Sequence, residues 1–204
     1  MLDAALIKEC ADTSLTPAIV EQFVAAAGST DPLAVTVKSG GRLILVPKVN
    51  SPDDAMAVVR RYAGQAAVRV GLTQFPAGVG TSDASELKRD LVEPCANLRM
   101  GTAMFAKILR IVTKWYGNPK SEEVFPQIFD DAVYAWKTGE FEGESVFQAE
   151  DPGKVVTIDR ALPAGDGEVS SDAPPADTDT ENDDEGQNLG SADMRIDLSR
   201  IGGK

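Results

Sequence analysis

Apolar residues recur every three to four positions in several segments of the chain, which is the spacing of one face of an α-helix. Most of these segments begin next to a capping residue or a proline and end at a glycine. Thr16 and Pro17 precede one segment, for example, and Gly28 follows it. The pattern predicts helices over residues 2–11, 17–27, 52–63, 94–116 and 121–138, with a further short helix near 83–91.

The longest predicted helix begins at Pro94 and ends before Gly117. Its apolar positions define one face, which contains Leu98, Gly101, Phe105, Ile108, Val112 and Trp115. A helix of this length with such a face is expected to lie at the centre of the core.

Two β-branched runs, at residues 33–37 and 42–46, are separated by a Ser-Gly-Gly sequence. Two extended runs with a glycine-rich connection predict a β-hairpin. After the last helix, residues 141–148 and 154–158 are expected to form either short strands or an ordered wrap over the surface. The predicted fold class is therefore mainly α with a small β-hairpin (α+β), in one domain over residues 1–160.

The rest of the chain is acidic and contains few apolar residues. Residues 163–193 hold ten Asp or Glu and no Lys or Arg. Such a segment is too polar to offset its ordering entropy by burial, so a disordered acidic linker is expected over 161–193. In the short tail peptide at 194–204, apolar and polar residues alternate from Met194 to Ile201. This alternation fits addition of a strand to the sheet edge of a partner, and it is also compatible with an apolar remnant without function.

The composition excludes several kinds of chemistry. The sequence has no histidine, which removes Ser-His-Asp triads, Cys-His dyads and His-ligated zinc sites, and no metal or cofactor is expected. The net charge is -12 and no basic cluster is present, so nucleic acid is not an expected partner.

No apolar run approaches the roughly 20 residues that span a bilayer, and the first residues lack the pattern of a secretory signal. Composition leaves open whether Cys10 and Cys95 are free thiols or a disulfide.

Three motifs follow one another in the order found in one enzyme family. They are Gly40-Gly41-Arg42-Leu43, Gly71-Leu72-Thr73-Gln74 and Pro94-Cys95-Ala96-Asn97-Leu98. With these motifs, residues 5–150 resemble the lytic transglycosylases of type IV secretion and conjugation systems. The resemblance implies a lysozyme-like domain with a cleft for the glycan strands of peptidoglycan. It also implies a disulfide between Cys10 and Cys95, and with it a location in the periplasm.

In the lytic transglycosylases, a single glutamate at the end of the second helix protonates the glycosidic oxygen. The resulting carboxylate then takes a proton from the 6-hydroxyl of the sugar, so that an anhydro ring closes. The resemblance implies that Gln74 hydrogen-bonds the sugar and that Phe75 and Trp136 contact the substrate. From its sequence context alone, Gln74 is equally compatible with a role in the turn, and for Phe75 a place in the core is favoured over contact with sugar. Asn97 is expected to cap its helix or tie a neighbouring loop.

The sequence departs from this family at the catalytic position. Alignment on the flanking residues places the glutamate at Ala26 or Ala27. The nearest carboxylates are Glu21, about 8 Å earlier along the helix axis, and Asp31, which lies beyond the helix and is expected to cap a turn. The family's proton donor is therefore expected to be missing.

Three functions are compatible with the sequence. The first is an accessory protein of a type IV secretion or conjugation system that has lost catalysis and binds peptidoglycan or has a structural role. Its tail, from Met194 to Ile201, would recruit a component of that system. The second is an active lytic transglycosylase in which Glu21 or Asp31 supplies the acid. The third is a cytosolic regulator that binds a partner and reuses the fold.

Overall fold

The computed structural model describes residues 2–80 and 83–153 of the 204-residue chain. The chain divides into two units, Met1–Ala164 and Gly165–Lys204, and every described residue belongs to the first. The predictions made for residues 154–204 lie outside the described residues.

Five α-helices form in the described part of the chain, at the places where the apolar pattern predicts them. Two of them begin at side-chain caps: Thr16, as expected, accepts a hydrogen bond from the N–H of Ile19, and Ser51 accepts one from the N–H of Asp54. The helices are α1 (Ala4–Cys10), α2 (Pro17–Ala27), α3 (Pro52–Tyr62), α4 (Pro94–Trp115) and α5 (Phe125–Thr138).

A small antiparallel sheet packs beside these helices, with strand order β2-β1-β3-β4. The predicted hairpin is confirmed, and its two-residue turn has positive φ at both Gly40 (55°) and Gly41 (77°), which is the geometry that favours glycine. The strands are β1 (Val35–Ser39), β2 (Arg42–Ile44), β3 (Ala67–Val70) and β4 (Phe75–Ala77). β3 and β4 were not predicted, because each is only three or four residues long and Gly71 interrupts the apolar run between them.

The segment after α5 forms both the short strands and the wrap that the sequence left open. A two-stranded hairpin, β5 (Glu140–Phe141) and β6 (Glu144–Ser145), is followed by residues that α4 holds in place. The ammonium of Lys107 donates to the carbonyl oxygens of Phe147 and Ala149 at 3.0 Å, and Arg110 pairs with Asp151.

The predicted helix at 83–91 is wrong, since the segment forms two 3-10 turns, η1 (Ala84–Glu86) and η2 (Arg89–Leu91). Leu87 and Leu91 are its buried apolar side chains, too few to hold an α-helix on the core.

The start of α5 also differs from the prediction. A third 3-10 turn, η3 (Glu122–Val124), precedes the helix, so α5 begins at Phe125 and not at Ser121. Pro126 has no N–H to donate, and it is therefore accommodated in the first turn of an α-helix and not in its interior.

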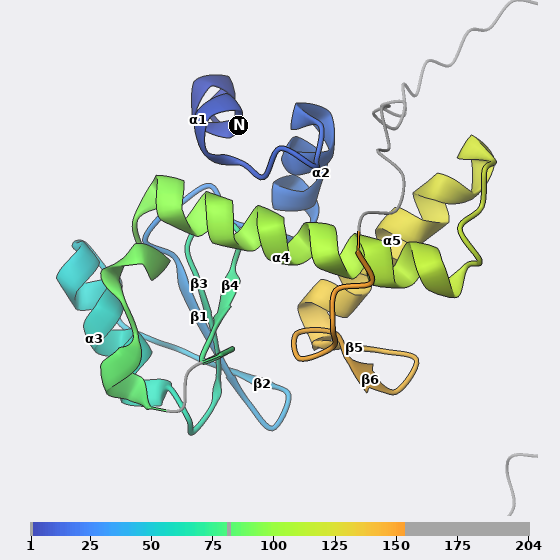
Figure 1. Cartoon of the computed structure of the whole chain (residues 1–204). Coiled ribbons are helices and arrows are strands. Elements are labelled where there is room, and N and C mark those ends of the chain that lie inside the picture. Colours follow the sequence, from blue (N-terminus) through green and yellow to red (C-terminus); the bar gives the residue numbers. More distant parts are fainter. Residues whose placement is uncertain (1, 81–82, 154–204) are drawn as a thin grey trace, which may run out of the picture. The chain divides into compact units, whose positions relative to one another are not determined.

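The core is built around α4. Figure 1 shows α4 running across the domain, with α1 and α2 on one side and the sheet and α3 on the other. The predicted face of α4 is buried from Leu98 to Val112, but Trp115 is 57% exposed because it lies in the last turn, where its ring packs on Phe141. The rings of Phe23 and Phe105 stack at 4.0 Å between centroids, which joins α2 to α4.

Candidate functional site

The turn Gly71–Gln74 joins β3 to β4 and lies against the end of α2. The N–H of Ser29, just past α2, donates to the carbonyl oxygen of Leu72 at 2.8 Å, and the N–H of Gly71 donates to the carbonyl oxygen of Ala34 at 2.8 Å. A Cβ at Gly28 would lie 2.2 Å from the Leu72 oxygen. The end of α2 is thus in direct contact with the turn that carries Gln74.

Asn97, in the first turns of α4, holds this turn from the inside. Its side chain is fully buried and makes four hydrogen bonds. The amide nitrogen donates to the carbonyl oxygens of Val70 (3.0 Å) and Leu91 (2.8 Å), and Oδ1 accepts from the N–H and the hydroxyl of Thr73, both at 3.0 Å. The expectation that Asn97 ties a neighbouring loop is confirmed. Because a Cβ at Gly71 would lie 2.4 Å from the Asn97 amide nitrogen, this position needs glycine for space as well as for its φ of 74°.

Thr73 sits where the turn, α4 and α5 meet. Its side chain is fully buried, and its carbonyl oxygen accepts a hydrogen bond from the indole nitrogen of Trp136 at 3.2 Å. A Cβ at Gly101 of α4 would lie 2.2 Å from the Thr73 hydroxyl oxygen. The approach of turn and helix therefore depends on the absence of a side chain at Gly101.

Replacing Gly101 with alanine is expected to destabilise the protein by about 2 kcal/mol, although Gly→Ala inside a helix normally stabilises. The added methyl group has to displace Thr73, which is held by Asn97. Urea unfolding followed by circular dichroism measures the change. Ala103→Gly, at an exposed position of the same helix, is the control and should cost only about 1 kcal/mol through helix propensity. A stabilised Gly101→Ala protein would contradict the close packing of Gly101 on Thr73.

Gln74 is the residue of this turn whose polar side chain is partly exposed to solvent. The residue is half-buried and has a left-handed backbone, with φ of 51°. Its amide nitrogen donates to the carbonyl oxygens of Gly71 (3.1 Å) and Ala34 (3.4 Å), and these two hydrogen bonds fix the orientation of the side chain. The predicted hydrogen bond to a sugar would have to come from the rest of the amide group.

The two aromatic residues predicted to contact substrate lie close to Gln74 but belong to the core. Phe75 is 9% exposed and Trp136 is 0% exposed, with 6.3 Å between their ring centroids. Trp136 also packs edge-on against Phe23 at 5.1 Å. In this arrangement neither ring face is open to a sugar, so the substrate contact that the resemblance implies for Trp136 does not agree with its burial.

At the end of α2 the side chains are small. Ala26 is exposed and Ala27 is half-buried against the core. Glu21 is exposed on the same helix. Asp31 is also exposed, and its carboxylate accepts a hydrogen bond from the N–H of Leu33 at 2.9 Å, which is the turn-capping role expected for it.

Arg69 of β3 is a residue of this neighbourhood that sequence reasoning missed. Its guanidinium donates to the carbonyl oxygens of Gln74 (3.3 Å), Trp136 (2.6 Å) and Lys137 (3.0 Å), and so caps the C-terminal end of α5. It also lies over the rings of Trp136 and Phe147. Burial lowers the pKa of Arg69 to about 10, which leaves the group charged at neutral pH. The signal in the sequence that could have identified Arg69 is its position between two valines, Val68 and Val70, which are buried in β3.

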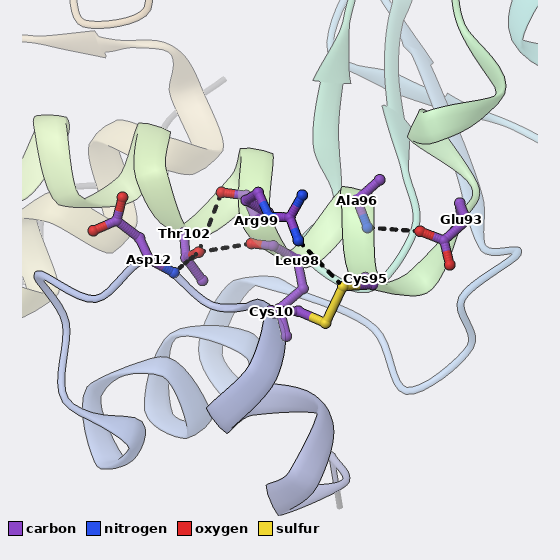
Figure 2. Close-up of a disulfide and its surroundings, with 8 residues drawn as sticks. All are labelled: Cys10, Asp12, Glu93, Cys95, Ala96, Leu98, Arg99 and Thr102. Atoms are coloured by element: carbon purple, nitrogen blue, oxygen red, sulfur yellow. Dashed lines mark hydrogen bonds between the residues drawn. A yellow bond between two sulfur atoms is a disulfide. The ribbon is translucent and has the colours of Figure 1, made fainter.

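A disulfide fixes the N-terminal end of α4, which carries Asn97. Figure 2 shows Cys10, at the end of α1, bonded to Cys95 in the first turn of α4, with 5.2 Å between the Cα atoms. Beside it, the N–H of Asp12 donates to the hydroxyl of Thr102 at 2.8 Å. The structure thus contains the disulfide that the resemblance implied.

Comparison with known proteins identifies the family of this chain. The TraH_2 family model matches residues 1–203. The chain belongs to the TraH_2 family. It is also 67% identical over 203 residues to "Uncharacterized protein y4dP" of Sinorhizobium fredii (strain NBRC 101917 / NGR234), and the match covers 100% of both chains. No solved structure matches.

TraH_2 is a conjugal transfer family, so the predicted link to conjugation is confirmed at this level. The disulfide of the TraH_2 chain is compatible with a periplasmic location. None of its described helices is long and apolar enough to cross a membrane. Within the described ranges no group of His, Cys, Asp or Glu side chains could hold a metal ion.

The TraH_2 protein also has a shallow hollow away from Gln74. It lies between the turn of the first hairpin and the turn that follows α3, and it was not predicted from the sequence. Its lining residues are small or polar: Lys38, Ser39, Gly40, Gly41, Gly64, Gln65, Ala66 and Ala67. The described part of the protein therefore has a concave surface that is separate from the end of α2.

Proposed function

We propose that this TraH_2 protein is a non-catalytic, transglycosylase-like accessory of a conjugation apparatus, and that it binds the glycan strands of peptidoglycan at the turn Gly71–Gln74. One observation carries the proposal. The end of α2 lies directly on this turn, and the positions that the resemblance assigns to the proton donor hold Ala26 and Ala27. On this proposal, the turn and the helix end of a transglycosylase site are retained, and the glutamate that supplies the proton is absent.

The loss of the acid is decisive for the chemistry. A positioned general acid contributes about 10² to 10⁴ in rate, and an unprotonated sugar alkoxide is a poor leaving group. Glu21 is exposed on α2 and earlier in the helix, while the carboxylate of Asp31 is engaged with the N–H of Leu33. Both residues are exposed, so neither lies in the enclosed, desolvated surroundings typical of a general acid.

Binding without cleavage is compatible with the remaining groups. Gln74 is oriented by its hydrogen bonds to Gly71 and Ala34, and the turn is rigid because Asn97 fills its interior. A preorganised amide at the surface is suited to hydrogen-bond a sugar hydroxyl. The disulfide between Cys10 and Cys95 supports a periplasmic site of action, where the glycan is accessible.

The full-length protein is expected to co-sediment with insoluble peptidoglycan and to release no anhydro-muropeptides detectable by mass spectrometry. Gln74→Asn keeps a residue that tolerates the left-handed backbone but withdraws the amide, and it should weaken binding about fivefold to tenfold. Gln65→Asn, at an exposed position, is the matched control and should bind like the wild type.

The other outcomes distinguish the alternative functions. Anhydro-muropeptides that disappear with Glu21→Gln or Asp31→Asn would establish an active transglycosylase. If the wild type does not sediment with peptidoglycan, wall binding is refuted and the partner-binding regulator becomes the better explanation. Activity created by Ala26→Glu or Ala27→Glu would add independent support for a former catalytic site at the end of α2.

A further inference from the structure

The outer edge of the sheet carries two exposed leucines. β2 is an edge strand, and Leu43 and Leu45 are 60% and 89% exposed. They are two of the four large apolar or aromatic residues that are exposed in the described ranges. Ile44 and Val46 alternate with them and are half-buried against the core. Exposed leucines that occur singly need no explanation, whereas two that project side by side form an apolar surface.

The register of the hairpin places a cation on the same face of the sheet as Leu43. Lys38 of β1 pairs with Leu43 of β2, and residues directly opposite each other in an antiparallel pair point to the same face. On its other side Lys38 pairs with Ala67 of β3. Lys38 and Ala67 both line the shallow hollow between the hairpin turn and the turn after α3. Leu43, Lys38 and the hollow therefore share one face of the sheet.

The part of the domain that contains the sheet and α3 has a charge opposite to that of the whole chain. Residues 32–82 hold six Lys or Arg and two Asp, a net charge of +4, in a chain whose net charge is -12. Lys38, Arg42 and Lys48 lie closest in sequence to the two leucines, and all three are exposed. None of the three forms a salt bridge with another described residue. Their charges are therefore available to an anionic partner.

Two kinds of anionic partner are compatible with such a surface: an acidic strand that extends the sheet, and a bilayer that contains anionic lipids. β2 has only three residues and carries Arg42, and short, charged edge strands resist the addition of another strand. Leu45, the more exposed leucine, lies beyond the end of β2 at Ile44. A bilayer needs no backbone pairing, only apolar side chains that enter the lipid and cations at the level of the headgroups. These observations favour the bilayer.

We propose that Leu43 and Leu45 insert into the surface of a bilayer that contains anionic lipids, with Lys38, Arg42 and Lys48 beside the lipid phosphates. The contact is peripheral, because only the side chains at one edge of the sheet enter the lipid. The proposal is independent of glycan binding, because the turn proposed to bind glycan joins β3 to β4 at the other end of the strand order.

Sedimentation of the full-length protein with vesicles tests this contact. The wild type is expected to bind vesicles of equal parts phosphatidylcholine and phosphatidylglycerol, and to bind vesicles of phosphatidylcholine alone at least about tenfold more weakly. The reason is that each Lys or Arg near an anionic surface strengthens binding about fivefold. Added salt should weaken binding to the anionic vesicles, because it screens these charges.

Removal of the leucines tests the apolar part of the contact. Leu43→Ser/Leu45→Ser is expected to lower the vesicle partition coefficient at least about tenfold, because two apolar side chains no longer leave water. Tyr134→Ser removes a side chain of similar exposure (63%) from α5 and should bind like the wild type. The leucine variant should keep the circular dichroism spectrum of the wild type and should still sediment with peptidoglycan.

Removal of two cations tests the electrostatic part. Lys38→Gln/Arg42→Gln is expected to lower the partition coefficient about twentyfold. Lys114→Gln/Lys120→Gln makes the same change in net charge at exposed positions at and after the end of α4, and it should bind like the wild type.

Failure of the wild type to bind anionic vesicles, or equal binding by the wild type and the leucine variant, would overturn the proposal. Two further outcomes would overturn it in favour of another occupant. Wild-type dimers that the leucine variant does not form would identify a second copy of the chain. NMR shifts of the Leu43 and Leu45 amides on addition of a synthetic peptide of alternating glutamate and leucine, without vesicle binding, would identify an acidic strand.

Discussion

Replacing Asn97 with alanine is expected to destabilise the protein by about 3–5 kcal/mol, a large effect for a single substitution. The substitution removes four buried hydrogen bonds at once and leaves the N–H of Thr73 and the carbonyl oxygens of Val70 and Leu91 without their partner. Buried polar groups that lose their partner cost more than the hydrogen bond itself contributed. Urea unfolding monitored by circular dichroism gives the change in free energy.

Asn50→Ala, at an exposed position, is the matched control and should change the stability by less than about 0.5 kcal/mol. Asn97→Asp is informative as well, because it keeps the acceptor for Thr73 but removes the donor to Val70 and Leu91 and introduces a buried charge. A loss of under about 1 kcal/mol in Asn97→Ala would show that the turn does not depend on this side chain.

Removal of the disulfide is expected to have an effect of similar size. The bond closes a loop with a sequence separation of 85 between Cys10 and Cys95. The chain-entropy model assigns a loop of this length a stabilisation of about 4.5 kcal/mol, and measured values are often smaller. Cys10→Ala/Cys95→Ala should therefore unfold at a clearly lower urea concentration than the oxidised wild type.

Reductant provides the control for this second prediction. It should lower the urea midpoint of the wild type toward that of the double variant and leave the double variant unchanged. Alkylation of two thiols in the unfolded protein without prior reduction would contradict the disulfide. The same alkylation assay on protein taken from the periplasmic fraction of cells would test the proposed location.

The elements that the sequence predicted correctly depend on local chemistry. Thr16, Pro17 and Gly28 mark both ends of α2, and the paired glycines of the first hairpin mark a two-residue turn. In each case the residues that define the boundary lie within a few positions of it. The pattern of apolar positions was sufficient for α4 because this helix is long and has one continuous buried face.

The elements that were missed depend on residues far apart in the chain. β3 is held as a strand by its pairing with β1, in which Val68 faces Val37 across more than thirty positions of sequence. Its four residues do not show enough alternation to be distinguished from a loop. The exposure of Trp115 is likewise decided by where α4 ends relative to its neighbours, which helical periodicity does not describe.

The candidate site could be predicted in outline but not in detail. The resemblance brought Gln74, Phe75, Trp136 and the end of α2 into one neighbourhood, and the structure has them there. It did not indicate that Trp136 is fully buried, because an aromatic residue near a helix end has the same sequence pattern in a cleft wall as in a core.

The contacts of Arg69 link the folding of segments that are distant in sequence. The last carbonyl oxygens of α5 accept their hydrogen bonds from a guanidinium on β3, 67 and 68 positions earlier in the chain. A helix end of this kind would ordinarily fray, but here fraying would take from the half-buried guanidinium two of the three carbonyl oxygens to which it donates. We therefore expect the final turn of α5 and strand β3 to open together, so that their backbone N–H groups exchange at similar rates.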